Sequence, residues 1–359
     1  MGVGAEELAS RSAGWGQAGE PRARGYWDFV WSRFKRDRLA VASGIFVLFA
    51  LLACFVGEPV AQHFLGHGPN DIFPLAADIN AHPVGPWTHV PNSHGVIQVT
   101  AKTPRTLFIL GADGQLGRDE FLRLLAGGRT SLEIAFGAAA IAVALGLAFG
   151  LLAGYFGRWI DAVVSRMTEF VMGFPLLLFV IALGRSIGDR FDKVTVHGAF
   201  VPGVLSLVVA IGIFSWFYPA RIVRAQVLSL RERDFVEAAR MVGASDLRII
   251  RKHLLPHVAG SLVVYATLIV ATTIILEAAL SILNFGIGLP DATWGNMIAT
   301  NWGTLLAPGG PHGYSESAFV HTSWLTTFWP TTALLLTVLA FNLLGEGLRE
   351  ALDPRARRR

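Results

Sequence analysis

The chain has 359 residues, of which 53% are hydrophobic and 16% are charged, and its mean hydropathy is +0.50. Soluble globular chains carry about a quarter charged residues, so this composition excludes an ordinary soluble domain and indicates a membrane protein. The single cysteine, Cys54, excludes a disulfide or a thiolate metal site within one chain. The formal net charge of +4 is better explained by membrane topology than by nucleic-acid binding.

Six apolar runs follow an N-terminal tail that is rich in Gly, Ala, Ser and charged residues and that we expect to be flexible. Each run holds about 18 to 26 residues, and about 20 residues of α-helix cross a hydrocarbon core of about 30 Å. We therefore predict an all-α polytopic membrane protein with six transmembrane helices. The predicted spans cover residues 39–56, 131–153, 159–183, 199–220, 258–283 and 324–344.

Lys and Arg are concentrated in alternate segments between these runs. There are seven in residues 1–38, eight in 221–257 and five after residue 345, against none in 285–323. Positive residues favour the cytoplasmic side of a membrane, so we place both termini and the 221–257 loop in the cytoplasm. An even number of spans is consistent with this placement.

This topology divides the chain into five parts. We expect a cytoplasmic N-terminal tail at residues 1–38, the first transmembrane helix at 39–57 and an extracytoplasmic loop region at 58–130. A core of five transmembrane helices follows at 131–346, and a basic cytoplasmic tail at 347–359.

Small residues recur at every fourth position along the second predicted span. On a helix such a stripe lies on one face, and small residues let helix backbones approach closely in lipid. General enrichment of Gly and Ala in membrane helices is the alternative explanation, but five residues in register favour a helix-packing face. The stripe consists of Ala138, Ala142, Gly146, Gly150 and Gly154.

Ionisable residues are scarce within the predicted spans. Asp161, Arg166 and Glu169 lie near the inner end of the third span, where long side chains can reach the interface, and Glu277 lies well inside the fifth. A charge in lipid is costly, so we expect Glu277 either to face a pathway or to bond with polar groups near Ser281. This scarcity argues against internal ion coupling, and the alternative class of function is a self-sufficient channel or an ion-coupled carrier. The spans hold no paired nucleophile and base for an intramembrane enzyme.

The polar loop between the fourth and fifth spans carries signals for two short helices. Asp234 is placed to cap the first, and Gly243 follows where a left-handed C-terminal cap is needed. Ser245 or Asp246 is placed to cap the second, which we expect to stop before Pro256. The first helix suits a partner's groove, although an amphipathic helix on the membrane surface is equally consistent with the spacing alone. Its apolar anchors are Phe235, Met241 and Val242.

Two kinds of site are not favoured by the sequence. The chain holds no G-x-x-x-x-G-K-[S/T] motif, so a nucleotide would have to bind to another subunit. His63 and His67 are four residues apart, as two metal ligands on a helix can be, but the glycines and the proline that follow disfavour a continuous helix. We expect a solvated, slightly His-rich loop that also includes His82, His89 and His94.

Residues 237–256 (EAARMVGASDLRIIRKHLLP) resemble the cytoplasmic coupling loop of an ABC-transporter permease subunit. The shared pattern is a Glu-Ala-Ala triplet, a Gly six residues after its Glu and a Leu-Pro exit. In that family an ATPase subunit moves the membrane helices through this loop. The resemblance implies an ATPase-coupling role for Asp234, Phe235, Glu237, Ala238, Ala239, Gly243, Ala244, Leu255 and Pro256.

Four further segments resemble the dipeptide, oligopeptide and nickel permease branch of this family, specifically the "C" member of its permease pair. The resemblance runs from about residue 27 to the C-terminus, with Ala112 where the branch usually has Thr and Asn284 where Gly is common. The segments are 33–41 (RFKRDRLAV), 110–119 (LGADGQLGRD), 277–288 (EAALSILNFGIG) with the WGNM that follows it, and 341–355 (FNLLGEGLREALDPR).

The resemblance implies a type I ABC importer permease fold in a bacterial or archaeal plasma membrane. This subunit would form half of the pathway beside a sister permease, with two cytoplasmic ATPase subunits and an extracytoplasmic solute-binding protein. ATP and Mg would bind to the ATPase subunits, so the chain itself is expected to hold no cofactor and to catalyse no reaction. Di- or oligopeptides are the expected cargo, and nickel or another small solute is the alternative.

Overall fold

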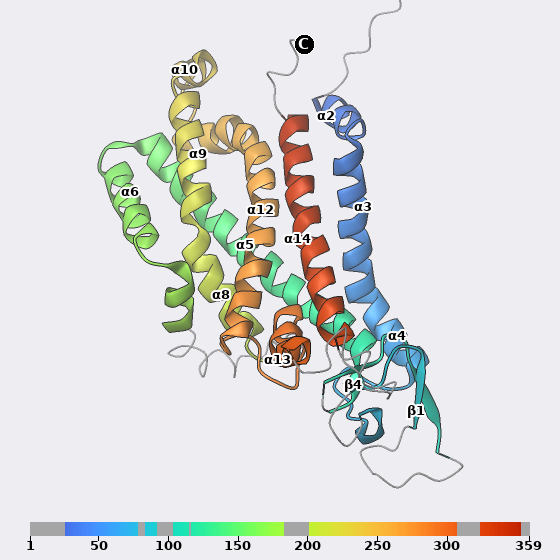
Figure 1. Ribbon diagram of the computed structural model, residues 1–359. Coiled ribbons are helices and arrows are strands. Elements are labelled where there is room, and N and C mark those ends of the chain that lie inside the picture. Colours follow the sequence, from blue (N-terminus) through green and yellow to red (C-terminus); the bar gives the residue numbers. More distant parts are fainter. Residues whose placement is uncertain are drawn as a thin grey trace, which may run out of the picture.

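The computed structural model describes residues 26–77, 83–91, 103–114, 116–182, 201–306 and 324–352. They form a bundle of long helices with a small module of strands at one end (Figure 1). α14 lies beside α3, so the two ends of the described chain share one side of the bundle. The helices are α2 (Tyr26–Phe34), α3 (Arg38–Leu52), α4 (Glu58–Leu65), α5 (Glu120–Phe156), α6 (Arg158–Met172), α8 (Val204–Ser215), α9 (Phe217–Leu230), α10 (Asp234–Met241), α11 (Asp246–Ile249), α12 (Leu255–Ile282), α13 (Trp294–Leu306) and α14 (Leu325–Leu352).

Within these ranges, five helices are long and apolar enough to cross a membrane, and a sixth span results if one bent helix pair is counted with them. The predicted class, an all-α polytopic membrane protein, is therefore confirmed. The five continuous spans are Arg38–Leu65, Glu120–Phe156, Val204–Leu230, Asp246–Ile282 and Leu325–Leu352.

The third predicted span is broken, so the expectation of one continuous helix is wrong there. α6 and a short helix at Leu176–Ala182 are bent by 85° relative to each other. α6 ends at Met172 with Gly173 as its C-cap residue, and Pro175 directly precedes the next helix. Proline lacks a backbone N–H and disfavours the helical conformation at the residue before it, Phe174. The local sequence therefore accounts for the break.

α5 begins about three turns earlier than the apolar run predicts. The carboxylate of Asp119 accepts hydrogen bonds from the backbone N–H groups of Phe121 (2.8 Å) and Leu122 (3.1 Å). This cap satisfies two donors that a helix N-terminus otherwise leaves unpaired. The helix can therefore include polar residues that hydropathy alone excludes, and it reaches 37 residues.

α5 crosses the bundle diagonally and packs against α8, α9 and α12 (Figure 1). The small-residue stripe lies on this contact. A Cβ atom on Gly150 would lie 2.7 Å from the Ala220 carbonyl oxygen, and one on Gly154 would lie 2.7 Å from Val227 Cβ. Side chains at these positions would force the helices apart. The other stripe residues are likewise buried: Ala138, Ala142 and Gly146.

The predicted loop region between the first two spans contains a folded module. β1 (Thr88–Pro91) pairs with β2 (Arg105–Phe108), and β3 (Ala112–Asp113) pairs with β4 (Arg118–Asp119), both antiparallel. We call the end of the molecule that carries these strands the hairpin end. The apolar core of the module consists of Phe73, Ala76, Val84, Val90, Phe108 and Ala112.

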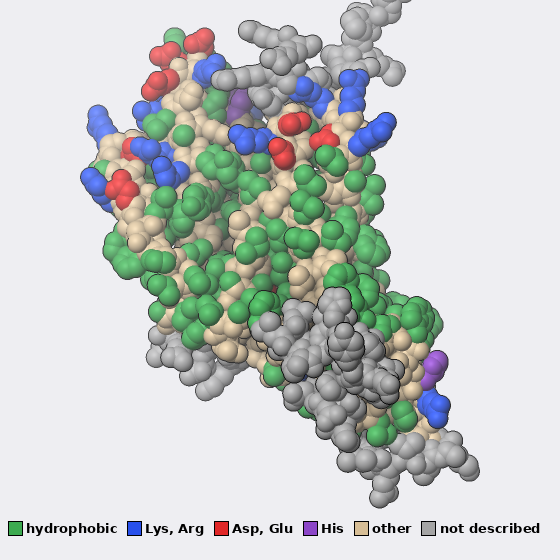
Figure 2. Space-filling model, viewed as in Figure 1, with side chains coloured by type: hydrophobic (Ala, Val, Ile, Leu, Met, Phe, Trp, Pro, Cys, Tyr) green, Lys and Arg blue, Asp and Glu red, His purple; other side chains and the backbone are tan. Residues whose placement is uncertain are grey.

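The opposite end of the bundle, which we call the α10 end, carries α10 and both ends of the described chain (Figure 1). In Figure 2, hydrophobic side chains cover the middle of the bundle, and most of the visible Lys, Arg, Asp and Glu side chains gather at the α10 end. A membrane-spanning bundle shows this division between an apolar belt and charged ends.

Candidate functional site

α10 projects beyond the bundle at the α10 end (Figure 1), and α11 follows it in the chain. On their inner side, Val236 and Ile249 are buried in an apolar cluster with side chains of α5, α9 and α12. On their outer side, Met241 and Val242 are each 87% exposed and Leu247 is 65% exposed. The loop therefore has a fixed inner side and an apolar outer tip.

The ends of α10 differ in part from the sequence-based expectation. The predicted capping role of Asp234 is wrong, because Arg233 occupies the N-cap position and Asp234 is the first helical residue. A carboxylate in the first turn still complements the helix dipole. At the other end Gly243 has φ of +80°, and the Ala244 N–H donates to the Ala239 carbonyl at 3.0 Å. This is the hydrogen bond of a Schellman turn, which needs a residue in the left-handed conformation.

The second helix of the loop does not stop before Pro256, so that prediction is wrong. Ser245 holds the N-cap position of α11, and the helix then continues without interruption over Asp246–Ile282. A wider π-helical turn at Ile250–Leu254 joins α11 to α12. Pro256 follows in the first turn of α12, where the wider turn accommodates a residue without an N–H.

The loop residues selected from the sequence are not all at the outer surface. Phe235 is 37% exposed, and its ring stacks on His257 of α12 with a centroid distance of 5.4 Å, so it anchors α10 more than it offers a contact. Leu247 belongs to the outer tip and was not selected, because its position in α11 carries no motif. Asp234, Glu237, Ala238, Gly243 and Pro256 are exposed, whereas Ala239, Ala244 and Leu255 are partly buried.

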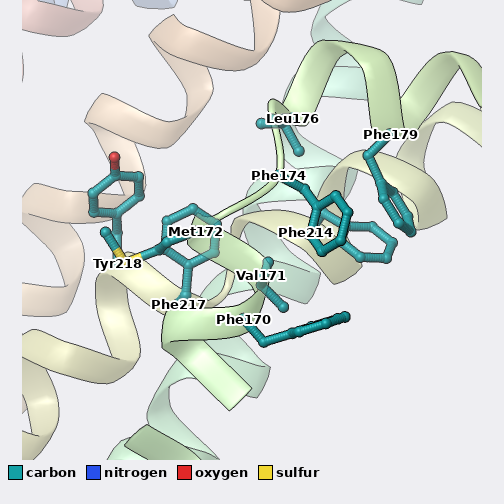
Figure 3. A pocket seen from close by; sticks show the side chains of 9 residues that line it. All are labelled: Phe170, Val171, Met172, Phe174, Leu176, Phe179, Phe214, Phe217 and Tyr218. Carbon is teal, nitrogen blue, oxygen red and sulfur yellow. The ribbon is translucent and has the colours of Figure 1, made fainter. Parts of the chain in front are cut away.

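A pocket of about 230 Å³ lies at the break between α6 and the helix Leu176–Ala182 (Figure 3). Figure 3 shows that its side chains come from both sides of the break and from the α8–α9 junction. The rings of Phe179 and Phe214 lie 3.8 Å apart between centroids. Its aromatic lining consists of Phe170, Phe174, Phe179, Phe214, Phe217 and Tyr218.

A second cavity, of about 440 Å³, adjoins the aromatic pocket, and Met172 lines both. Its lining mixes apolar and charged side chains and includes Glu169, Arg221 and Arg224. Arg224 also binds Asp161 of α6 through two donors, and its Nη2 lies 2.8 Å from Asp161 Oδ2. This ion pair fixes α6 against α9. One face of the molecule thus combines an aromatic pocket with a cavity that carries both signs of charge.

Glu277 is fully buried where α12 meets α5 and the start of α13. The Ser281 hydroxyl donates to one carboxylate oxygen at 2.8 Å, and the Ser131 hydroxyl lies 3.3 Å from the other. Ser131 in turn accepts the backbone N–H of Trp294 at 3.2 Å. The carboxylate therefore links α12 to α5 through hydroxyl groups, and Ser131 extends this contact to α13. Ser281, selected with it from the sequence, is one of its partners.

His67 is buried at the hairpin end, so the expectation that this histidine belongs to a solvated loop is wrong. Its ring lies against Phe73 and Phe108, at centroid distances of 5.1 and 5.9 Å. Its Nε2 lies 3.0 Å from Asp119 Oδ2, and its Nδ1 lies 3.1 Å from the Leu65 carbonyl oxygen. The Thr106 hydroxyl also lies 3.2 Å from Nδ1. The Asp119 carboxylate and the Leu65 carbonyl are acceptors, so a ring that carries protons on both nitrogens satisfies both of them.

The direction of the pKa shift of His67 agrees with this geometry. Burial lowers the pKa of His67, but the hydrogen bonds to Asp119 and Leu65 and the negative charge of Asp119 outweigh burial, and the net pKa is raised. His63 and His89 lie apart from this pair, whereas His82 and His94 fall outside the described residues. Among the residues that the structure describes, no three His, Cys, Asp or Glu side chains are grouped to hold a metal ion.

Asp113, within the segment 110–119, joins the strand module to the helices. It forms a buried ion pair with Arg123 of α5 and accepts from the Asn301 amide of α13 at 2.6 Å. Arg123 also donates to the Pro290 carbonyl at 3.0 Å. The hairpin end is therefore fastened to α5 and to the loop before α13.

Two family models match the chain. The model described as "Binding-protein-dependent transport system inner membrane component" matches residues 146–358. The model described as "N-terminal TM domain of oligopeptide transport permease C" matches residues 25–83. Together they cover most of the described helices.

Similar proteins come from several bacteria. A putative peptide permease protein of Brucella ovis is 36% identical over 90% of this chain and 90% of its own length. The dipeptide transport system permease protein DppC of Bacillus subtilis is 34% identical over 93% of this chain and 87% of its own length. The glutathione transport system permease protein GsiD of Pectobacterium atrosepticum is 33% identical over 92% and 91%.

Proposed function

Because the chain belongs to the family of inner membrane components of binding-protein-dependent transport systems, we propose that it forms half of the pathway of an ATP-driven peptide importer. The family resemblance read from the motifs is confirmed. The chain is a permease subunit of an ABC importer, and the ATPase is a separate subunit. Peptide cargo is supported by the relatives that match about nine tenths of the chain, which are named for peptides, a dipeptide and glutathione.

The partners that we propose follow from this role. A sister permease completes the pathway, two ATPase subunits bind ATP and Mg, and a solute-binding protein delivers cargo from the other side of the membrane. The family description, which names transport that depends on a binding protein, supports this assembly. We further propose that the assembly lies in a bacterial or archaeal plasma membrane.

We assign ATPase docking to the α10–α11 loop. Its outer tip exposes Met241, Val242 and Leu247 to solvent at the charged end of the molecule, and several exposed apolar side chains on one short loop suit a groove on a partner. Its inner side is buried in the bundle. A push on the tip is therefore transmitted to the helices and not absorbed by a loose loop.

The α10 end is the cytoplasmic end in this proposal. It carries the 221–257 loop with its eight Lys and Arg residues, as well as both ends of the described chain. Positive residues near span ends favour the cytoplasm. The strand module then faces the solute-binding protein.

We propose that the face with the two adjoining cavities lines the pathway. A peptide presents apolar side chains and two charged termini, and this face offers an aromatic pocket beside a cavity with Glu169, Arg221 and Arg224. Aromatic surfaces bind apolar groups, and fixed charges orient charged ones. The break in α6 places both features next to each other.

Gly243→Val tests the docking role of the loop. The new Cβ has open space around it, so the damage comes from φ of +80°, which a β-branched residue rarely adopts, and it deforms the turn after α10. In the importer co-expressed with the subunits encoded by neighbouring reading frames, we expect normal chain levels but loss of ATPase retention and of ATP-dependent dipeptide uptake. Glu237→Lys on the exposed side of α10 should act in the same direction.

Gly66→Val is the matched control, because Gly66 also has positive φ (+73°) and open surroundings but lies at the hairpin end. It should retain the ATPase subunits. Unchanged ATPase retention and uptake in both loop variants would contradict the docking role. Uptake of Ni²⁺ in place of dipeptides by the unmodified importer would contradict peptide cargo while leaving the docking role intact.

A further inference from the structure

The last turn of α5 is fastened to the loop that carries α10 and α11 by three side chains. The Tyr155 hydroxyl donates to Asp246 Oδ1 of α11 at 2.5 Å. The Arg240 guanidinium of α10 lies over the Tyr155 ring, 5.5 Å from its centroid. Arg231, which follows α9, donates to the backbone carbonyls of Gly154 (3.1 Å) and Tyr155 (3.4 Å). The end of α5 is therefore held by one residue from each of three segments: Arg231 after α9, Arg240 of α10 and Asp246 of α11.

These contacts are of unequal strength. A hydrogen bond from a hydroxyl to a carboxylate is short and strong, whereas the exposed cation of Arg240 over the Tyr155 ring contributes less. Arg231 complements the negative end of the α5 dipole. Tyr155 itself is only 6% exposed, and its ring belongs to the same apolar cluster as Val236, Ile249 and Leu254 of the loop. The loop and the end of α5 are thus one packed unit.

α5 is suited to carry a displacement from this unit into the bundle. It is an unbroken helix of 37 residues, about 55 Å long at 1.5 Å per residue. Close contacts at Gly150 and Gly154 lock it to α9, and Asp119 and Arg123 fix its other end to the strand module. A rigid element with close contacts along its length moves as a body when one end is pushed.

We propose that the Tyr155 hydroxyl and the Asp246 carboxylate form the joint that passes movement of the α10–α11 loop to α5, with Arg240 holding the Tyr155 ring in place. Tyr155 is a positioning residue, because it acts on the pathway through α5. The proposal rests on the proposed function, since the loop moves only if an ATPase subunit docks on it. Sequence reasoning gave no signal for Tyr155, which lies 91 residues before Asp246.

Tyr155→Phe tests the joint, because it removes only the hydroxyl and keeps the ring, its apolar neighbours and the position of Arg240 over the ring. In the complete importer reconstituted in vesicles, we expect dipeptide uptake per ATP hydrolysed to fall about tenfold, as loss of a hydrogen bond to a charged group implies. The amount of folded chain and the retention of ATPase subunits should not change.

Variants at Asp246 separate the joint from a general structural role. Asp246→Asn keeps an acceptor oxygen for the Tyr155 hydroxyl, so it should retain most of the uptake per ATP. Asp246→Ala should lower it as Tyr155→Phe does. The double variant Tyr155→Phe/Asp246→Ala should be no worse than either single variant, because both remove the same contact. Tyr265→Phe on α12, a partly buried tyrosine, is the matched control and should behave as the unmodified chain.

If Tyr155→Phe takes up as much dipeptide per ATP hydrolysed as the unmodified chain does, the proposed joint is refuted. A fall in uptake that only follows a fall in the amount of folded chain would overturn it as well, because that result describes stability and not coupling. The two proposals fail differently. If Gly243→Val loses ATPase retention while Tyr155→Phe keeps normal dipeptide uptake per ATP hydrolysed, the docking role is supported and the joint is refuted. If Gly243→Val and Glu237→Lys keep both the ATPase subunits and dipeptide uptake, the docking role and the joint are refuted together.

Discussion

Glu277 is held by hydroxyl groups on two helices, Ser131 of α5 and Ser281 of α12, and Ser131 also accepts the Trp294 N–H. The sequence left two roles open for this acid, a pathway residue or a polar contact between helices. We propose the second role, because the carboxylate is enclosed and its partners lie on the elements that it joins. A buried polar group that has its partners can be retained within a membrane bundle.

Glu277→Leu should lower the amount of folded chain and its pairing with the sister permease. The two serine hydroxyls would lose their acceptor in a buried site, at a cost of about 1–3 kcal/mol for each unsatisfied group. Glu277→Gln keeps an acceptor and the shape, so it should assemble and transport nearly normally. Size-exclusion chromatography of the solubilised complex measures assembly, and dipeptide uptake measures transport.

Glu350→Leu on the exposed side of α14 is the control for the loss of a glutamate as such, and it should assemble normally. Normal assembly with lost transport in Glu277→Gln would assign Glu277 to the pathway instead. A fully active Glu277→Leu chain would refute both roles.

The His67–Asp119 pair should make the hairpin end more stable at low pH. Because the pKa of His67 is raised in the folded chain, the stabilisation is fully present below the ordinary histidine pKa of about 6.5 and is lost as pH rises through the raised value. Asp119, the Leu65 carbonyl, Thr106 and the nearby charge of Asp71 are the groups that face the ring.

The measurement is the apparent melting temperature of the solubilised chain as a function of pH. His67→Phe should melt several degrees below the unmodified chain near pH 6, and the difference should narrow as pH rises. His89→Phe, at an exposed histidine, should show no such dependence. A difference that widens with rising pH would contradict the charged state of His67.

Elements of secondary structure followed from the sequence to different degrees. The apolar runs predicted five continuous spans correctly because about 20 apolar residues can be buried in lipid only as a helix. Pro175 indicates a helix break in the local sequence. A hydropathy average does not detect it, because hydropathy does not depend on whether a residue has a backbone N–H. The four strands among the described residues are two to four residues long, and their pairing depends on the packing of the module and not on local propensity.

Site residues divide in the same way. The role of Gly243 could be predicted from the local sequence, because a glycine directly after a short helix is typical of a left-handed C-terminal cap. His67 and Tyr155 could not be predicted, since their partners Asp119 and Asp246 lie 52 and 91 residues away. Leu247 joins the exposed tip only because α11 continues into α12. Interactions set by tertiary contact leave no periodic signal in a single sequence.

Gly150 in the contact between α5 and α9 and Gly260 on α12 should respond differently to substitution by alanine. Gly150→Ala should lower the apparent melting temperature, because the new Cβ would lie 2.7 Å from a backbone oxygen of α9, and overpacking costs about 1–3 kcal/mol. Gly260→Ala places its Cβ at an ordinary 3.5 Å from Leu352 and gains about 1 kcal/mol of helix propensity. It should leave the melting temperature unchanged or raise it. Equal effects of the two variants would contradict the close contact.

The whole molecule has a charged α10 end, an apolar middle and a strand module, and we propose that the membrane surrounds the middle. The termini and the α10–α11 loop are then cytoplasmic, and the module is extracytoplasmic. In a Cys54→Ala background, cysteines introduced at Ser245 and His89, both exposed, should react with an impermeant thiol reagent from opposite faces. Opposite-face labelling in intact cells and inverted vesicles would support the six-span topology. Labelling from the same face would contradict it.

Peptide import driven by ATP is the central claim, and reconstitution of the complete importer in vesicles tests it most directly. The chain is combined with its sister permease, ATPase subunits and binding protein, and labelled dipeptide uptake is measured with ATP, without ATP, and with an imposed ion gradient alone. The account predicts uptake only with ATP and its loss in Gly243→Val. Uptake driven by the ion gradient in the absence of ATP, unaffected by Gly243→Val, would contradict it.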